Sequence, residues 1–111
     1  MTFQVVVKNV DYNCSRYVLE DCLLSEGSKP LKFALCRKDH GEQVHAVVFV
    51  HFGTHQEAFD FAHFVQELPE ETLRHKGLLG GHSTSLDVKV ERLHQKKVIW
   101  LLFMFGFQSM K

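Results

Sequence analysis

The stretch HAVVFVHF, residues 45–52, decides the fold because it predicts a long strand whose two faces differ. Successive side chains of a strand point to opposite sides of the sheet. The even-numbered positions carry only apolar side chains, which we expect to face the core: Ala46, Val48, Val50 and Phe52. The odd-numbered positions combine two imidazoles with an aromatic ring and a valine: His45, Val47, Phe49 and His51. This second face raises the question whether the strand only supports a core or also binds a ligand.

Three further segments alternate as strands do. They span Phe3–Val10, Leu31–Arg37 and Leu86–Glu91. Helices are expected over Cys14–Leu24 and between Thr54 and Pro69. The resulting order is β-α-β-β-α-β, which predicts an α+β, ferredoxin-like fold in which two helices back a four-stranded antiparallel sheet.

The helix that follows HAVVFVHF has the clearest start signal. Thr54 and Glu57 form a capping box, in which the threonine hydroxyl accepts a hydrogen bond from a backbone amide in the first turn. Pro69 is expected to end this helix. Its apolar stripe consists of Ala58, Phe61, Ala62, Val65 and Leu68. Phe59 and Phe64 lie off the stripe, so they either widen the core contact or are exposed for a partner.

Shorter signals complete the expected chain path. Asp11 and Asn13 predict the start of the first helix. The polar stretch KDHGEQ predicts a hairpin turn over Lys38–Gln43. The connection PEETLRHKGLLGGHSTS is long for a compact domain, so we expect it to contain a further helical turn or a short strand near Leu78–Leu79.

Composition restricts the function. A chain of 111 residues, 45% of them hydrophobic, builds one domain with a single core. Thirteen basic and thirteen acidic side chains cancel, which argues against a polyanion binder that depends on net charge. Cys14, Cys22 and Cys36 lack a CxxC spacing, so neither a zinc site nor a disulfide framework is expected. With no signal-peptide pattern at the N-terminus, these thiols predict an intracellular protein, nuclear or cytoplasmic.

The end of the sequence differs from the rest. We divide the chain into a domain over residues 1–94 and an apolar tail over residues 95–111. The run Val98–Phe107 has about half the length of a membrane-spanning helix. The tail is expected to form a fifth strand in its own monomer or an arm swapped into a second copy. Association with a membrane surface, in which Lys96 and Lys97 meet anionic head groups, ranks third. Its aromatic side chains are Trp100, Phe103, Phe105 and Phe107.

Residues 3–91 resemble an RNA-recognition motif. FVHF in residues 49–52 matches the second half of one strand motif of that family. VVVKNV in residues 5–10 is similar to the family's other strand motif through its asparagine and its aliphatic positions. Four positions depart from the family. Val6 and Val47 stand where aromatic rings would stack on bases, and His45 and Ala46 stand where the motif has a basic residue and a glycine.

The resemblance implies a platform for RNA or single-stranded nucleic acid on the open face of the sheet, the face that no helix covers. Phe49 would stack on a base. Contacts to phosphates would come from Lys8, Lys32, Lys89, His45 and His51. A purely structural role is the other interpretation, since half-polar faces occur in most antiparallel sheets.

The sequence holds no motif for catalysis or cofactor binding, such as a glycine-rich phosphate loop or a nucleophile elbow. His51 and His55 have the spacing of a metal pair, but the expected cap at Thr54 leaves His51 on the strand, so no metal site is predicted. We therefore expect a non-enzymatic interaction protein without cofactors, which forms a homo-oligomer or binds a partner protein. The predicted interface residues are Trp100, Phe103, Phe105, Phe107, Phe59 and Phe64. RNA binding is the alternative.

Overall fold

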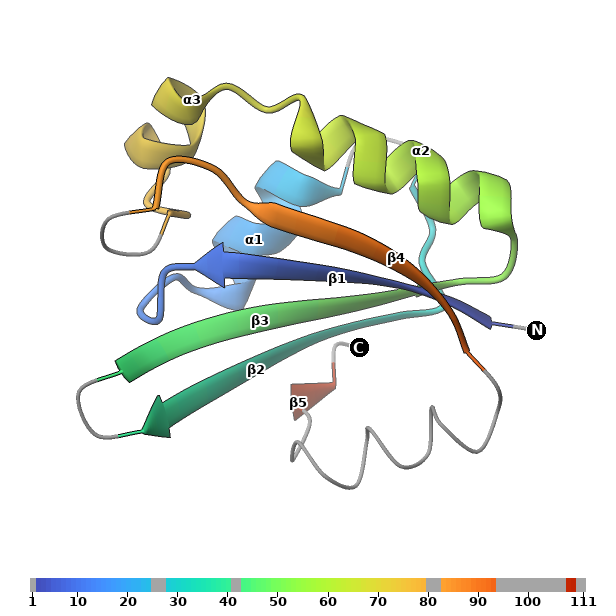
Figure 1. Ribbon diagram of the computed structural model, residues 1–111, viewed down its shortest axis with the longest axis horizontal. Helices are drawn as coiled ribbons and strands as arrows, with labels where there is room; N and C mark the ends of the chain where they lie inside the picture. Colours follow the sequence, from blue (N-terminus) through green and yellow to red (C-terminus); the bar gives the residue numbers. More distant parts are fainter. Residues whose placement is uncertain (1, 25–27, 41–42, 80–82, 94–107, 110–111) are drawn as a thin grey trace.

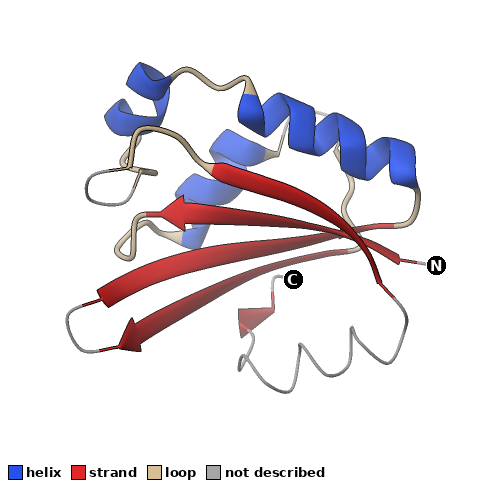
Figure 2. Ribbon diagram, in the orientation of Figure 1, coloured by secondary structure: helices blue, strands red, loops and turns tan. Residues whose placement is uncertain are grey.

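The computed structural model describes residues 2–24, 28–40, 43–79, 83–93 and 108–109, without the side chains of residues 38–40, 43, 45, 108 and 109. In these ranges one antiparallel sheet has the strand order β4-β1-β3-β2-β5, and the helices lie on one of its faces (Figure 1 and Figure 2). The elements are β1 (Thr2–Val10), α1 (Arg16–Leu23), β2 (Lys32–His40), β3 (Gln43–Phe52), α2 (His55–Gln66), α3 (Glu70–His75), β4 (Asp87–Leu93) and β5 (Gln108–Ser109).

The predicted α+β class is confirmed, with an antiparallel sheet whose four longer strands follow the order β4-β1-β3-β2. This order is compatible with a ferredoxin-like fold. The long connection after α2 contains the predicted helical turn, α3, whereas Leu79 forms only an isolated bridge with Val10 in place of a short strand. β5 pairs with the outer side of β2, where Ala34 faces Ser109.

The main core lies between the sheet and the helices. β1 pairs with β3 so that Val5 faces Val50, and both side chains are fully buried. The ring of Phe61 on α2 packs against that of Phe52, with 5.3 Å between their centroids. The prediction for the even-numbered positions of HAVVFVHF is confirmed, since all four are buried among these core residues.

The two longer helices begin at hydroxyl caps. Thr54 Oγ1 accepts a hydrogen bond from the backbone N–H of Glu57 at 3.2 Å, which confirms the predicted cap of α2. The same hydroxyl donates to the Glu57 carboxylate at 2.8 Å. At α1, Ser15 Oγ accepts from the backbone N–H of Val18 at 3.1 Å, so this helix starts at Arg16.

The predicted start signal of α1 was therefore wrong. Asp11 does not cap the helix, because its carboxylate accepts from the backbone N–H of Asn13 at 2.8 Å and shapes the turn that precedes Ser15. The predicted end of α2 was wrong as well. The helix ends at Gln66, and Pro69 instead precedes α3. Proline lacks a backbone N–H, and at the start of a helix this N–H would have no partner within the helix, so no hydrogen bond is lost.

The hairpin between β2 and β3 is tighter than predicted. The strands remain paired as far as His40 and Gln43, so most of the expected turn over Lys38–Gln43 belongs to the strands. Hairpins favour two-residue connections, whose twist matches that of the strands, and longer pairing satisfies more backbone groups.

We expect Thr54→Ala to lower the free energy of unfolding by about 1 kcal/mol, because it leaves a backbone amide at the start of α2 without its acceptor. Urea denaturation measures this as a lower midpoint with an unchanged slope. Thr54→Ser, which keeps the hydroxyl, is the control. Equal stability of the alanine and serine variants would contradict the role of the cap.

Candidate functional site

The open face of the sheet brings together side chains from four strands in rows that run across the sheet. The cross-strand pairs Glu91–Gln4, Gln4–His51 and His51–Lys32 make one continuous row from β4 to β2. The next row consists of Lys89, Val6, Phe49 and Ala34. Most of the predicted nucleic-acid residues therefore lie within two adjacent rows.

The first row is a hydrogen-bonded chain. Gln4 Nε2 donates to Glu91 Oε2 at 3.3 Å, which leaves the amide oxygen of Gln4 to accept from His51 Nε2 at 2.8 Å. His51 thus carries its proton on Nε2, because an amide oxygen can only accept. Gln4 is 0% exposed and His51 is 3% exposed. The pair is buried and internally satisfied.

Burial sets the charge of His51. It lowers the pKa of the imidazole to about 4, and the nearby ammonium of Lys32 acts in the same direction. His51 is therefore neutral at physiological pH. Its predicted role as a cationic phosphate contact does not fit this state, since a neutral buried imidazole already bonded to Gln4 has no charge for a phosphate.

The second row is apolar at its centre. Val6, Phe49 and Cys36 form a small buried cluster with Val47 against it, separate from the main core. Phe49 lies on the open face as predicted, but its ring is only 7% exposed, which leaves little surface for stacking on a base. Lys8 and Lys89 are exposed on the same face. The side chain of His45 lies outside the described ones.

Three strands contain runs of consecutive buried residues: Gln4–Val7 in β1, Phe33–Cys36 in β2 and Val48–Phe52 in β3. A sheet covered on one face alternates buried and exposed positions, whereas a sheet covered on both faces does not. The open face is therefore buried in its central part. The apolar runs VVV (residues 5–7) and AVVFV (residues 46–50) are the sequence signal for this arrangement, which the alternating interpretation missed.

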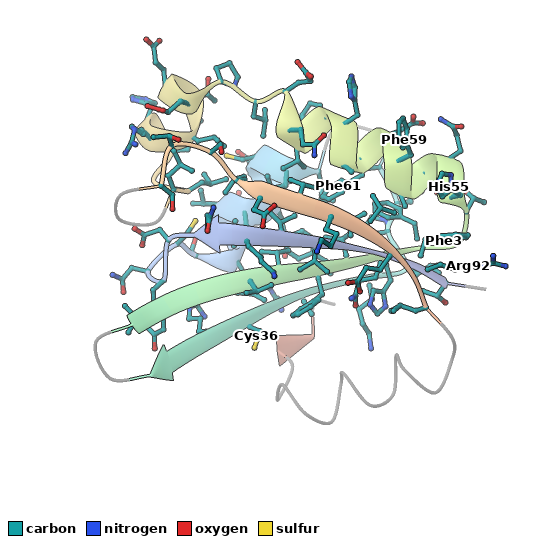
Figure 3. All side chains as sticks on the ribbon, in the orientation of Figure 1. Phe3, Cys36, His55, Phe59, Phe61 and Arg92 are labelled. Atoms are coloured by element: carbon teal, nitrogen blue, oxygen red, sulfur yellow. The ribbon has the colours of Figure 1, made fainter. Side chains whose placement is uncertain are left out.

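A second group of side chains lies on the helix side, where β1 and β4 meet the start of α2. Phe3 and His55 are in edge contact with centroids 5.5 Å apart, and His55 stacks on Phe59 at 6.1 Å and 27° (Figure 3). We call Phe3, His55 and Phe59 the aromatic row. A groove beside it is lined by Phe3, His55, Val90 and Arg92.

The aromatic row is accessible. Phe59 is 54% exposed, and Phe64 on the same helix is 38% exposed. Of the two interpretations of these rings, exposure is therefore the one observed. Phe3 and His55 lack a sequence signal that joins them, because 52 positions separate them in the chain. The other predicted interface residues, Trp100, Phe103, Phe105 and Phe107, lie outside the described residues.

Other kinds of site find little support in the described ranges. No group of three or more His, Cys, Asp or Glu side chains there is placed to hold a metal ion. Burial raises the pKa of the Cys14 and Cys22 thiols, which keeps them protonated at neutral pH. Among the described helices, none has the length and apolar character needed to cross a bilayer.

Comparisons of the chain with protein-family models, curated proteins and solved structures gave no match.

His51 should make stability depend on pH. Between pH 6.5 and pH 4 the unfolded chain binds a proton at this imidazole and the folded chain does not, so the free energy of unfolding falls as the pH falls. The loss attributable to His51 should reach about 3 kcal/mol near pH 4 and vanish above pH 6.5. Urea denaturation of the intact chain and of His51→Gln across this range measures it. His63→Gln, an exposed site on α2, is the control, and parallel pH profiles for the intact chain and His51→Gln would contradict the burial of a neutral imidazole.

Phe49→Leu should leave any affinity for single-stranded RNA unchanged, because the ring is buried and not available to a base. The substitution keeps most of the apolar volume and should cost less than about 1.5 kcal/mol of stability. Fluorescence anisotropy with labelled RNA at low and high salt tests this. A tenfold loss of affinity would show that the ring is a stacking platform after all.

Proposed function

We propose that this chain is a protein-interaction domain with an RRM-like, ferredoxin-type sandwich, which binds another protein chain through the aromatic row at α2. The partner is a second copy of the chain or a different protein. The single observation that carries this proposal is the exposure of Phe59, stacked on His55 beside an apolar groove.

The aromatic row has the properties of an interface anchor. Aromatic side chains contribute a large part of the energy of protein interfaces, and they lose little conformational entropy on binding. His55 contacts a ring on each side, so Phe59 is held in place before a partner arrives. Arg92 also lines the groove, so the surface beside the aromatic row combines apolar and polar groups, as protein interfaces do.

Nucleic-acid binding has weaker support. Of the residues that the family resemblance assigns to RNA, Phe49 and His51 are buried, and Val6 replaces a stacking ring. Lys8 and Lys89 remain exposed and Lys32 is half-buried, but lysines offer phosphate contacts without base stacking. We therefore propose a protein partner in preference to RNA.

Phe59→Ser is the test of this function, with Tyr17→Ser as its matched control, since Tyr17 is a 79% exposed aromatic on α1. Sedimentation over a range of concentrations measures self-association, and selection from a displayed peptide library measures binding of other chains. We expect Phe59→Ser to weaken the association, or the binding of a selected peptide, at least tenfold, and Tyr17→Ser to change it less than twofold.

Both variants replace an exposed helical aromatic, so their thermal unfolding should differ little and serves as the folding control. If the intact chain keeps the mass of one copy at every concentration, and no selected peptide depends on Phe59, the proposed function is overturned. Equal losses in the two variants would also contradict it, because they would point to exposed aromatic area in general rather than to the aromatic row.

A further inference from the structure

The open face of the sheet is buried along one diagonal and exposed at one corner. Leu93 and Gln4 are buried near one end of the sheet, and burial continues through Phe49 to Ala34 on β2. The corner at the other end of β4, away from Leu93, is different, because its side chains are exposed: Lys8, Asp87 and Lys89. The helices lie on the other side of the sheet, so they do not cover this diagonal (Figure 1).

The ends of the diagonal coincide with the ends of one chain segment. β4 stops at Leu93 at one edge of the sheet, and β5 starts at Gln108 beside β2, at the other edge. Residues 94–107 join these two points. Adjacent strands lie about 4.8 Å apart. Four such spacings, combined with the offset along the strands, separate Leu93 from Gln108 by roughly 20–25 Å.

The fourteen residues from 94 to 107 reach this far across the open face in either helical or extended form, since a helix rises about 1.5 Å and a strand about 3.3 Å per residue. A route over the helix side must go around the helices, which form a layer roughly 10 Å thick. Such a path needs almost the full extended length of residues 94–107. The open face is therefore the short connection.

We propose that the apolar segment 94–107 docks on the open face of the sheet of its own chain, along the diagonal from Leu93 to Ala34. The chemistry of the two surfaces matches, because the segment contains the run Val98–Phe107 and the face has an apolar centre at Val6 and Phe49. This docking removes a long apolar run from water and occupies the place where a nucleic acid would stack. The proposal does not depend on the proposed function, which uses the helix side.

Cys36 reports on this docking, because it is a buried thiol on the open face. Cys14 is the internal reference, since it is equally buried but belongs to the core on the helix side. Figure 3 shows Cys36 at the sheet, far from the helix layer. The experiment labels the intact chain with iodoacetamide and follows each cysteine by peptide mass spectrometry. We expect both thiols to be protected, and Cys36 to stay protected on dilution.

The test variant replaces Trp100, Phe103, Phe105 and Phe107 with serine and keeps the chain length. Cys36 should then react at least tenfold faster while Cys14 stays protected. Tyr17→Ser, at a 79% exposed aromatic on α1, is the control and should change neither rate. Continued protection of Cys36 in the test variant would overturn the proposal, as would rapid labelling of Cys36 in the intact chain.

Two further outcomes are also decisive. If protection of Cys36 disappears on dilution while Cys14 remains protected, the segment belongs to a second copy, and docking within one chain is excluded. If the fourfold variant exposes both thiols, it has unfolded, and the four single serine substitutions replace it. At least one of them should then raise the Cys36 rate threefold or more with Cys14 unchanged, and the proposal fails if none does.

Discussion

The pairing of β1 with β3 is the constraint on which both sides of the sheet depend. It places Val5 opposite Val50 on the helix side and Gln4 opposite His51 on the open face. A slip of one residue would move every side chain of one strand to the other face. It would also separate Gln4 from His51, and a buried polar group without a partner costs about 1–3 kcal/mol. The 2.8 Å hydrogen bond between these side chains therefore helps to specify the register that positions both surfaces.

The helix-side core could be predicted because its signals are local. Alternation along HAVVFVHF and the three- and four-residue spacing after Thr54 each depend on a single element. The exact ends of elements could not be predicted in the same way. Asp11, Asn13 and Ser15 are all good helix caps, and only the three-dimensional path decides that Asp11 turns back to Asn13 while Ser15 accepts from the helix.

The candidate sites were predictable only in part. The strand pattern placed Phe49 and His51 on the correct face, but burial depends on what covers that face, which lies elsewhere in the chain. The position of Phe59 off the apolar stripe of α2 allowed either a wider core contact or exposure, and the tertiary structure leaves the ring exposed. Its stacking partner and the groove could not be predicted, because Phe3 and His55 come together only through tertiary structure.

The departures from the RNA-recognition motif have a physical explanation in the same burial. Exposed aromatic rings suit a face that receives flat bases, whereas valine suits a face packed against other side chains, since its branched Cβ fills space on a pleated surface with little loss of conformational freedom. Val6 lies in a buried cluster with Phe49, and Val47 packs against it. The residues that weaken the case for a nucleic-acid platform are thus the residues that a covered face requires, and both observations follow from one property of the sheet.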